Sequence, residues 1–546
     1  MRITSIGHAG LFIETKDASI LCDPWFNPAY FASWFPFPDN SDIDVEAISN
    51  PDYLYVSHLH HDHFDPTFLR DHVSKDTTVL LPDYPIDLLE RALVDLGFER
   101  FARTRNAEPL ELDHGLRILI VALTAPTDGP IGDSGLAVDD GEVRIFNQND
   151  SRPIDLGPLH EFGAYAGHFL QYSGAIWYPM VYELPEPAKR QLGRTKRANG
   201  MGRARRYIQQ LGASFVFPFA GPPAFLDDDL YAFNDTTRDD ANVFPDQTVF
   251  LEELRAAGID NGRLIVSGSV ITLDARGCDI EHPAPDDEIE AIFTQKERYL
   301  RAYQARQRTR IELERKSWPQ GEVDDLVGAL RDWWEPLLRD ADMTCAGVNG
   351  RVLIEADDEP ILIDFLDRRV HRWDGEPVRY RFRVQRALVE SCVLRHVEDW
   401  VNELFLSCRF TARREGPFNE YVYNFFKSLS PERMRHTEAY YREHRSVEEL
   451  VRFDGYLVQR HCPHLSADLS RFGEVDDGVL TCTMHGWQFD LATGECLTSN
   501  DRHLHTQRVD GPAPSDGPAP SDTGAPTNGE TPTDGETEPT ARRMRG

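Results

Sequence analysis

The chain has 546 residues, of which 40% are hydrophobic, enough for ordinary cores in about three domains. Its 91 acidic and 58 basic side chains give a formal charge of -33, which argues against nucleic acid or an anionic membrane as the main partner. No stretch reaches the ~20 apolar residues of a membrane helix, and no apolar leader follows Met1. We therefore expect a cytoplasmic protein.

The first 222 residues alternate short strand-like runs with helix-like stretches such as 86–96. This alternation predicts an α/β fold. The strand-like runs are 3–6, 10–14, 19–22, 53–56, 78–81, 117–121, 143–146 and 215–217.

A histidine-rich stretch, SHLHHDHFD at 57–65, directly follows the apolar run 53–56. A buried strand that opens into imidazoles and carboxylates is a platform for metal ligands, whereas the alternative is a solvated turn before a helix that starts at Asp65-Pro66. The spacing H-x-H-x-D-H lets alternate residues converge on one ion while the Asp-His pair turns to a second, and these donors suit zinc, iron or manganese. The candidate ligands are His58, His60, Asp62 and His63.

The motifs IGHAG at 6–10, ILCDPW at 20–25 and HLHHDH at 58–63 resemble the metallo-β-lactamase superfamily, above all its sugar-lactonase and phospholipase-D-like branch. The resemblance implies an αββα sandwich with metal at the edge where strand ends meet. It also implies that Asp150 is the bridging aspartate, and that His8 lies beside the ligands rather than among them.

Two departures put a standard two-zinc hydrolytic site in doubt. Segments 124–129 and 219–222 stand where the superfamily supplies two further histidines. If Asp128 replaces one of them, then His58, His60 and Asp128 form the set of two histidines and one carboxylate that holds non-haem iron(II). Asp128 is otherwise a turn residue before Gly129. We expect the nearby His168 to be a core or surface histidine.

The middle of the chain is less distinctive. A charged helical segment at about 286–315 and strand-like runs at 351–355 and 380–384 predict a mixed helical and β connector domain. Beyond residue 505 the composition collapses to Pro, Gly, Thr, Ser and Asp, which predicts a disordered tail. The expected domains are 1–285, 286–446, 447–505 and the tail 506–546.

The C-terminal region carries two paired motifs, Cys-Pro-His at 462–464 and Cys-Thr-Met-His at 482–485. Two thiolates and two imidazoles in paired loops are the ligands of a Rieske [2Fe-2S] centre, which would be held by Cys462, His464, Cys482 and His485. A structural zinc site uses the same residue types, but zinc fingers of that kind place both cysteines together and both histidines together.

The sequence His485-Gly486-Trp487, followed by Phe489-Asp490, is typical of Rieske domains. Ala467 and Thr483 stand where respiratory-complex Rieske proteins carry extra cysteines. The segment 447–499 therefore resembles Rieske ferredoxins and oxygenase components, and implies a small all-β domain.

The two sites together favour an O2-dependent oxidoreductase of the monooxygenase type over a hydrolase, because a hydrolytic zinc site uses no electrons. The same pair of modules resembles the CMP-N-acetylneuraminate hydroxylase-like family, although that family places its Rieske module first. We expect Asp62 and Asp128 to be catalytic. Rivals are a lactonase- or phosphodiesterase-like hydrolase with a redox-sensing cluster, a metal-free electron carrier, and another oxidation by the same iron.

The expected cofactors are the [2Fe-2S] cluster and one or two non-haem iron ions, with zinc as the alternative. The expected partners are a ferredoxin or flavin reductase, a small-molecule substrate and, as an open option, a second copy of the chain. Two basic runs, 194–206 and 379–383, either bind an anionic group of that substrate or are solvated faces.

Overall fold

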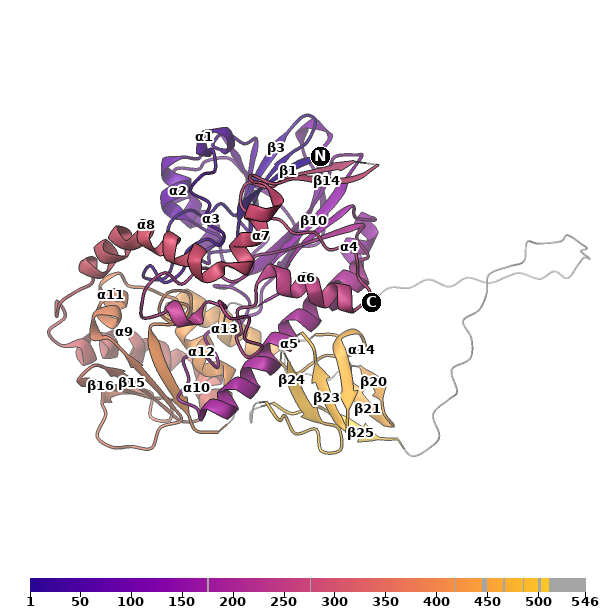
Figure 1. Cartoon of the computed structure of the whole chain (residues 1–546). Coiled ribbons are helices and arrows are strands. Elements are labelled where there is room, and N and C mark those ends of the chain that lie inside the picture. The colour runs from indigo at the N-terminus through magenta and orange to yellow at the C-terminus, as the bar shows by residue number, and fades with distance from the viewer. Residues whose placement is uncertain are drawn as a thin grey trace, which may run out of the picture.

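The computed structural model of the protein describes residues 1–173, 176–274, 276–416, 418–443, 449–464, 467–484, 486–498 and 502–509. Figure 1 shows a sandwich coloured indigo to magenta, an orange connector and a yellow C-terminal part, with helix α5 (Glu186–Leu211) running between the sandwich and the C-terminal part. The predicted disordered tail lies outside the described residues from 510 onward. None of the helices in the described ranges combines the length and apolar character that a membrane span needs.

Two sheets form the N-terminal sandwich. The first has eight strands, antiparallel from β14 to β3 and parallel from β3 to β6. In spatial order its strands are β14 (Gly277–Glu281), β13 (Val270–Asp274), β1 (Arg2–Gly7), β2 (Gly10–Glu14), β3 (Ser19–Cys22), β4 (Tyr53–Tyr55), β5 (Thr78–Leu81) and β6 (Phe101–Arg103). The second has β12 (Phe215–Phe219), β11 (Gly167–Gln171), β10 (Arg144–Asn149), β9 (Asp133–Asp139), β8 (Arg117–Leu123) and β7 (Pro109–Glu111).

The inner faces of the two sheets share one apolar core, to which Leu11, Ile118 and Phe169 contribute fully buried side chains. Helices cover both outer faces: α1 (Val45–Ile48), α2 (Pro66–Asp71) and α3 (Leu88–Asp95) on the first sheet, and α4 (Gly157–Phe162), α5 and α6 (Gln247–Ala256) on the second. The predicted αββα sandwich is confirmed. All eight predicted strands and the 86–96 helix are present, while β6, β7, β9, β11, β13 and β14 had no clear pattern in the sequence.

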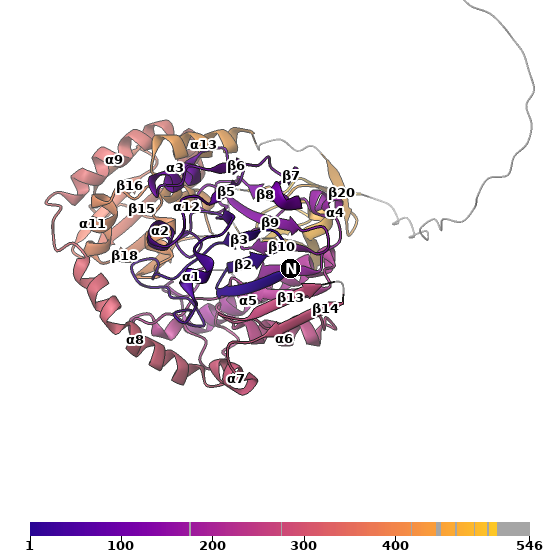
Figure 2. The same ribbon diagram turned by 90° about the horizontal axis from the view of Figure 1, so that it is seen from above.

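The connector has a five-stranded sheet in the order β17 (Arg369–Arg372), β16 (Glu359–Asp364), β15 (Arg351–Ala356), β18 (Tyr380–Val384) and β19 (Phe410–Arg414). Its helices are α9 (Leu326–Asp340), α10 (Asp342–Val348), α11 (Arg386–Leu394), α12 (Glu420–Lys427) and α13 (Pro431–Glu443), with a π-helical turn at Val401–Phe405. The predicted 286–315 helix is two helices, α7 (Asp286–Thr294) and α8 (Lys296–Ser317), and α8 curves around the outside of the molecule (Figure 2).

One apolar core joins the connector to the sandwich. Trp334, Trp400 and Phe426 of the connector belong to the same buried cluster as Trp25 and Tyr30, which follow β3. Burial of several large aromatic side chains across this boundary contributes on the order of 2 kcal/mol each, so the connector and the sandwich are held as one unit.

The C-terminal part has two three-stranded sheets and one short helix. The first sheet contains β20 (Leu450–Phe453), β21 (Tyr456–Gln459) and β25 (Thr506–Arg508), and the second β22 (Gly473–Asp476), β23 (Val479–Cys482) and β24 (Trp487–Asp490), with α14 at Leu469–Phe472. Its core is continuous with residues of α5 such as Met201 and Tyr207. The predicted domain boundaries themselves stay predictions.

Candidate metal and cluster sites

The histidine-rich loop lies at the edge where strand ends of both sheets meet. It connects the C-terminal end of β4 to α2, which begins, as predicted, after Asp65; that carboxylate caps the helix by accepting from Phe68 N–H. Asp150 follows β10 and His8 lies in the turn from β1 to β2. Strand ends thus carry side chains from three distant points of the chain to one place.

Two groups of potential ligand atoms converge there. Ring nitrogens of His58 and His60 gather with a carboxylate oxygen of Asp150, and those of His8 and His63 gather with Asp62; within each group the atoms lie within 4.8 Å of one another. Asp150 Oδ1 is also 3.0 Å from His63 Nε2, so this carboxylate lies between the two groups. This geometry would suit two ions that share the Asp150 carboxylate.

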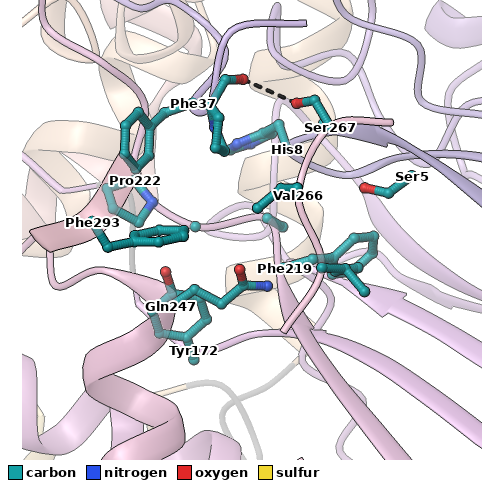
Figure 3. A pocket seen from close by; sticks show the side chains of 15 residues that line it. Ser5, His8, Phe37, Tyr172, Phe219, Pro222, Gln247, Val266, Ser267 and Phe293 are labelled. Carbon is teal, nitrogen blue, oxygen red and sulfur yellow. Dashed lines mark hydrogen bonds between the residues drawn. The ribbon is translucent and has the colours of Figure 1, made fainter. Parts of the chain in front are cut away.

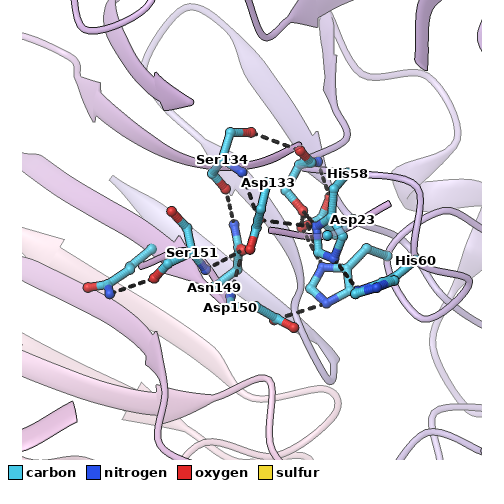
Figure 4. A network of polar contacts seen from close by, with 12 residues as sticks. Asp23, His58, His60, Asp133, Ser134, Asn149, Asp150 and Ser151 are labelled. Carbon is cyan, nitrogen blue, oxygen red and sulfur yellow. Dashed lines mark hydrogen bonds and ion pairs between the residues drawn. The ribbon is translucent and has the colours of Figure 1, made fainter. Parts of the chain in front are cut away.

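Polar neighbours hold several of these ligands in place, and Figure 4 shows part of the network that they form. Asp23 lies 3.0 Å from His63 Nδ1 and accepts from the backbone N–H and the hydroxyl of Ser57. Asp133 Oδ1 is 3.3 Å from His58 Nδ1. Carboxylates behind metal-binding histidines hold the ring and its tautomer in place.

Asp62 is held from two sides. Tyr30 donates its hydroxyl hydrogen to Oδ1 at 2.6 Å, and His8 Nε2 lies 2.9 Å from Oδ2. His8 thus lies in one of the two groups of potential ligand atoms and also contacts Asp62, so whether it binds the metal or supports a ligand stays a prediction. Its backbone carbonyl accepts from Ala220 N–H, which puts His8 against the segment where the superfamily carries its last histidine. Figure 3 shows His8 with Pro222, Tyr172 and Gln247 in the pocket on that side.

The donor set fits metal ions. Three of the converging atoms, His8 Nε2, His63 Nε2 and Asp150 Oδ1, are buried and make no well-directed hydrogen bond. Burial, with His63 and His60 nearby, lowers the pKa of His58 well below its usual range, and burial lowers that of His60 to about 3. Both rings are thus neutral at physiological pH, the form in which imidazole binds a metal.

Asp128 lies outside both groups. It sits in the loop between β8 and β9, and the position beside His58 and His60 is taken by Asp150. Its role as a ligand stays a prediction that the geometry does not favour. His168 is a core histidine, since it is fully buried on β11 and hydrogen-bonded to Gln148 Oε1 at 2.8 Å.

The second site lies in two loops of the C-terminal part. Cys462 and His464 are in the loop after β21, and Cys482 ends β23; all three are buried. The Cys462 thiol interacts with Cys482, and burial raises its pKa well above the usual range. His464 stacks on Trp487 with ring centroids 4.0 Å apart, and its Nε2 lies 2.8 Å from Glu420 Oε2. His485 lies outside the described residues.

These residues fit a [2Fe-2S] cluster. Two adjacent buried thiols provide the sulfur ligands, which iron would deprotonate, and a carboxylate on Nε2 leaves Nδ1 as the expected ligand atom of His464. Glu420 lies in the connector, and no motif in the sequence indicated that it would contact His464.

Most of the basic runs form ion pairs. On α5, Arg194, Arg197 and Arg206 pair with Asp240, Asp235 and Glu474. In the shorter run, Arg381 and Arg383 pair with Glu355. These ion pairs give the arginines a structural role. Lys196 and Arg203, in contrast, have no carboxylate partner in the part of the chain that the structure describes.

Family comparisons agree with this division. Residues 2–109 match a β-lactamase superfamily domain, residues 444–506 a Rieske [2Fe-2S] domain, and residues 326–443 an "Rv3818-like, SCP2-like domain". The chain is thus an iron–sulfur protein with a metallo-β-lactamase-like N-terminal domain, and the match over 326–443 identifies much of the connector.

Two mycobacterial proteins match over their entire length. Proteins of Mycolicibacterium smegmatis and Mycobacterium tuberculosis, the latter named Rv3818 and both named as Rieske 2Fe-2S iron-sulfur proteins, are each 47% identical to this chain and cover 93% of it. Cytidine monophosphate-N-acetylneuraminic acid hydroxylase of Cricetulus griseus is 26% identical over 40% of this chain and 40% of its own.

Among solved structures, CmlA, a diiron β-hydroxylase from Streptomyces venezuelae, matches 50% of this chain and 54% of its own at 18% identity and a TM-score of 0.34. An isothiocyanate hydrolase from Delia radicum gut bacteria matches 50% of this chain and 100% of its own at 14% identity and a TM-score of 0.37. Likenesses this distant do not discriminate between the two activities.

Proposed function

Because the chain belongs to the family of Rieske 2Fe-2S iron-sulfur proteins that includes Rv3818, we propose that it is an O2-dependent oxidoreductase. In this proposal the cluster at Cys462, His464, Cys482 and His485 supplies electrons to iron held by His58, His60, Asp62, His63 and Asp150, with His8 as a further ligand. The reaction is the oxidation of a C–H or N–H bond of a small molecule, and a ferredoxin or flavin reductase supplies the electrons.

The observation that carries the proposal is the position of Tyr207. Its hydroxyl group donates to Pro153 O at 3.0 Å and lies 3.2 Å from Met484 Sδ. Pro153 is three residues after Asp150, and Met484 directly precedes His485. A single buried side chain on α5 thus contacts both the metal-site loop and the cluster loop, which supports electron transfer between the two centres within one chain.

Helix α12 makes a second connection. Glu420 at its start contacts His464, while Lys427 at its end donates from Nζ to Thr127 O at 2.9 Å and Gly129 O at 2.6 Å. Seven residues of α-helix rise by about 10 Å. One helix of the connector therefore contacts both a cluster ligand and a loop beside the N-terminal site, which supports a one-electron relay and is not required by a hydrolase.

When bound, the cluster transfers single electrons and the N-terminal ions provide open positions for oxygen chemistry. The chain itself orients the imidazoles through Asp23 and Asp133 and shields the site from water by burial. Burial raises the pKa of Asp128 to about 6, against the influence of Lys427 and Arg152. Its carboxyl group can hold and release a proton near neutral pH, which fits the catalytic role expected for it.

The test is the metal and acid-labile sulfide content of anaerobically purified protein. The proposal predicts about four irons and two sulfides per chain, or about three irons if one ligand group alone is filled. His58→Ala/His60→Ala should lose iron and keep sulfide, and His72→Ala, an exposed histidine outside the site, should lose neither. Zinc in the N-terminal site of the parent would contradict the proposal and favour the hydrolase.

A further inference from the structure

Two cations of α5, Lys196 and Arg203, differ from the ion-paired arginines of the same helix. Arg203 donates from Nη1 to Met484 O at 2.9 Å, and Lys196 Nζ lies 5.6 Å from the ring centroid of Tyr178. Both side chains are half-buried. Neither contact neutralises a charge, so two positive charges remain at the boundary between the sandwich and the Rieske domain.

Two further cations join them from other segments. The guanidinium of Arg414, on β19, lies 4.8 Å from the same Tyr178 ring and donates to its hydroxyl at 3.3 Å. Arg152 forms no hydrogen bond or ion pair with any residue in the described ranges. Tyr178 thus holds Lys196 and Arg414 together on one ring.

The four charges act on one another. Burial, followed by the charges of Arg414, Arg152 and Arg203, lowers the pKa of Lys196 to about 8. Burial and Arg152 lower the pKa of Arg203 to about 9. The chain as a whole is strongly acidic, with a formal charge of -33. The carboxylates of Asp128 and Asp150 act on Arg152 and Arg203 from a distance. None of the four cations forms an ion pair within the described residues, so a bound anion would offset their mutual repulsion.

The place of this group relates it to both centres. Arg152 is two residues after Asp150, and Arg203 contacts the residue before His485. Helix α5 carries Lys196 and Arg203 along the boundary between the two domains (Figure 1). Two members of the group thus belong to, or contact, segments next to the two centres.

We propose that Arg152, Lys196, Arg203 and Arg414 form a binding site for a dianionic phosphate group of the substrate. Calling the bound molecule the substrate rests on the proposed oxidoreductase function; the site itself does not. A guanidinium group can donate two parallel hydrogen bonds to two oxygens of one phosphate group. Four positive charges also favour an anion with two negative charges over an anion with one. A single carboxylate would leave most of the repulsion in place.

The test is binding of inorganic phosphate to the full, cofactor-loaded chain, measured by calorimetry at constant ionic strength, with acetate as the singly charged comparison. We expect saturable phosphate binding, and binding of acetate at least tenfold weaker. Lys196→Gln and Arg414→Gln should each weaken phosphate binding about tenfold. Arg194→Gln, on the same helix but ion-paired and exposed, is the matched control and should bind as the parent does. Visible circular dichroism of the cluster checks that each variant is folded.

Several results would overturn the site. They are the absence of saturable phosphate binding, equal affinity in the parent and in both Lys196→Gln and Arg414→Gln, and acetate binding as tight as phosphate. Phosphate bound to the metal ions instead would lose affinity in His58→Ala/His60→Ala and keep it in Lys196→Gln, which also overturns the proposal. All of these readouts measure anion binding. A failure of the anion site is therefore distinguishable from a failure of the oxidoreductase function, which the iron and sulfide content tests.

Discussion

Glu420 Oε2 lies 2.8 Å from His464 Nε2, and both residues are buried, so a carboxylate of the connector faces an imidazole of the Rieske domain. The other oxygen of Glu420 accepts from Arg502. Burial alone would raise the pKa of Glu420, but Arg502 and His464 lower it to about 2. The carboxylate is therefore ionised at neutral pH and stabilises positive charge on the cluster side.

Glu420→Gln should raise the reduction potential of the cluster. Removing a negative charge beside a ligand favours the reduced, more negative state, and a shift of about 60 mV corresponds to a tenfold change in a one-electron equilibrium. A redox titration followed by visible circular dichroism measures the shift. Glu415→Gln, exposed in the same part of the chain, is the control. A potential unchanged by Glu420→Gln would show that the carboxylate does not act on the cluster.

Asp150→Asn should remove more metal from the N-terminal site than Asp128→Asn does. Asp150 belongs to one ligand group and lies 3.0 Å from His63 of the other, so its loss affects both ions, whereas Asp128 belongs to neither group. Metal analysis, with labile sulfide as the internal reference, compares the two variants. The opposite ranking would restore Asp128 as the ligand.

The local pattern of the sequence was sufficient to predict the strand before the HLHHDH loop, the helix start at Asp65 and the Rieske domain, because each depends on neighbouring residues. The position of His8 among the potential ligand atoms and the contact of Asp133 with His58 were not predicted, because strands far apart in sequence bring these residues in. Glu420 lies in a third domain with no motif of its own. Its role depends on domain packing, which periodicity and spacing do not encode.

Tyr207→Phe should slow electron transfer between the cluster and the N-terminal site severalfold. The change removes the hydroxyl that joins Pro153 O to Met484 Sδ, at a cost of about 1 kcal/mol in stability. Rapid-mixing absorbance of the cluster gives the rate. Tyr165→Phe, whose hydroxyl donates to Leu159 O away from the cluster loop, costs a similar hydrogen bond and should leave the rate unchanged. Equal rates in both variants would exclude Tyr207 from the path.

Binding of sulfate, which keeps two charges over the range, should weaken as pH rises through about 8. Burial, followed by the charges of Arg414, Arg152 and Arg203, lowers the pKa of Lys196 to about 8, so Lys196 carries its charge below that pH and loses it above. Calorimetry between about pH 6.5 and about pH 9.5 should show that the affinity for sulfate decreases in the parent. The profile of Lys196→Gln should be flatter. Identical profiles would contradict the assignment.

The transfer of electrons from the cluster to the N-terminal site is the central claim, and its most direct measurement is reoxidation of the reduced cluster by O2 in a stopped-flow instrument. The parent should reoxidise at least about ten times faster than His58→Ala/His60→Ala, a difference of about 1.4 kcal/mol in barrier. The cluster itself should give the same spectrum in both proteins. Equal reoxidation rates would mean that electrons leave the cluster without passing to the N-terminal metal site.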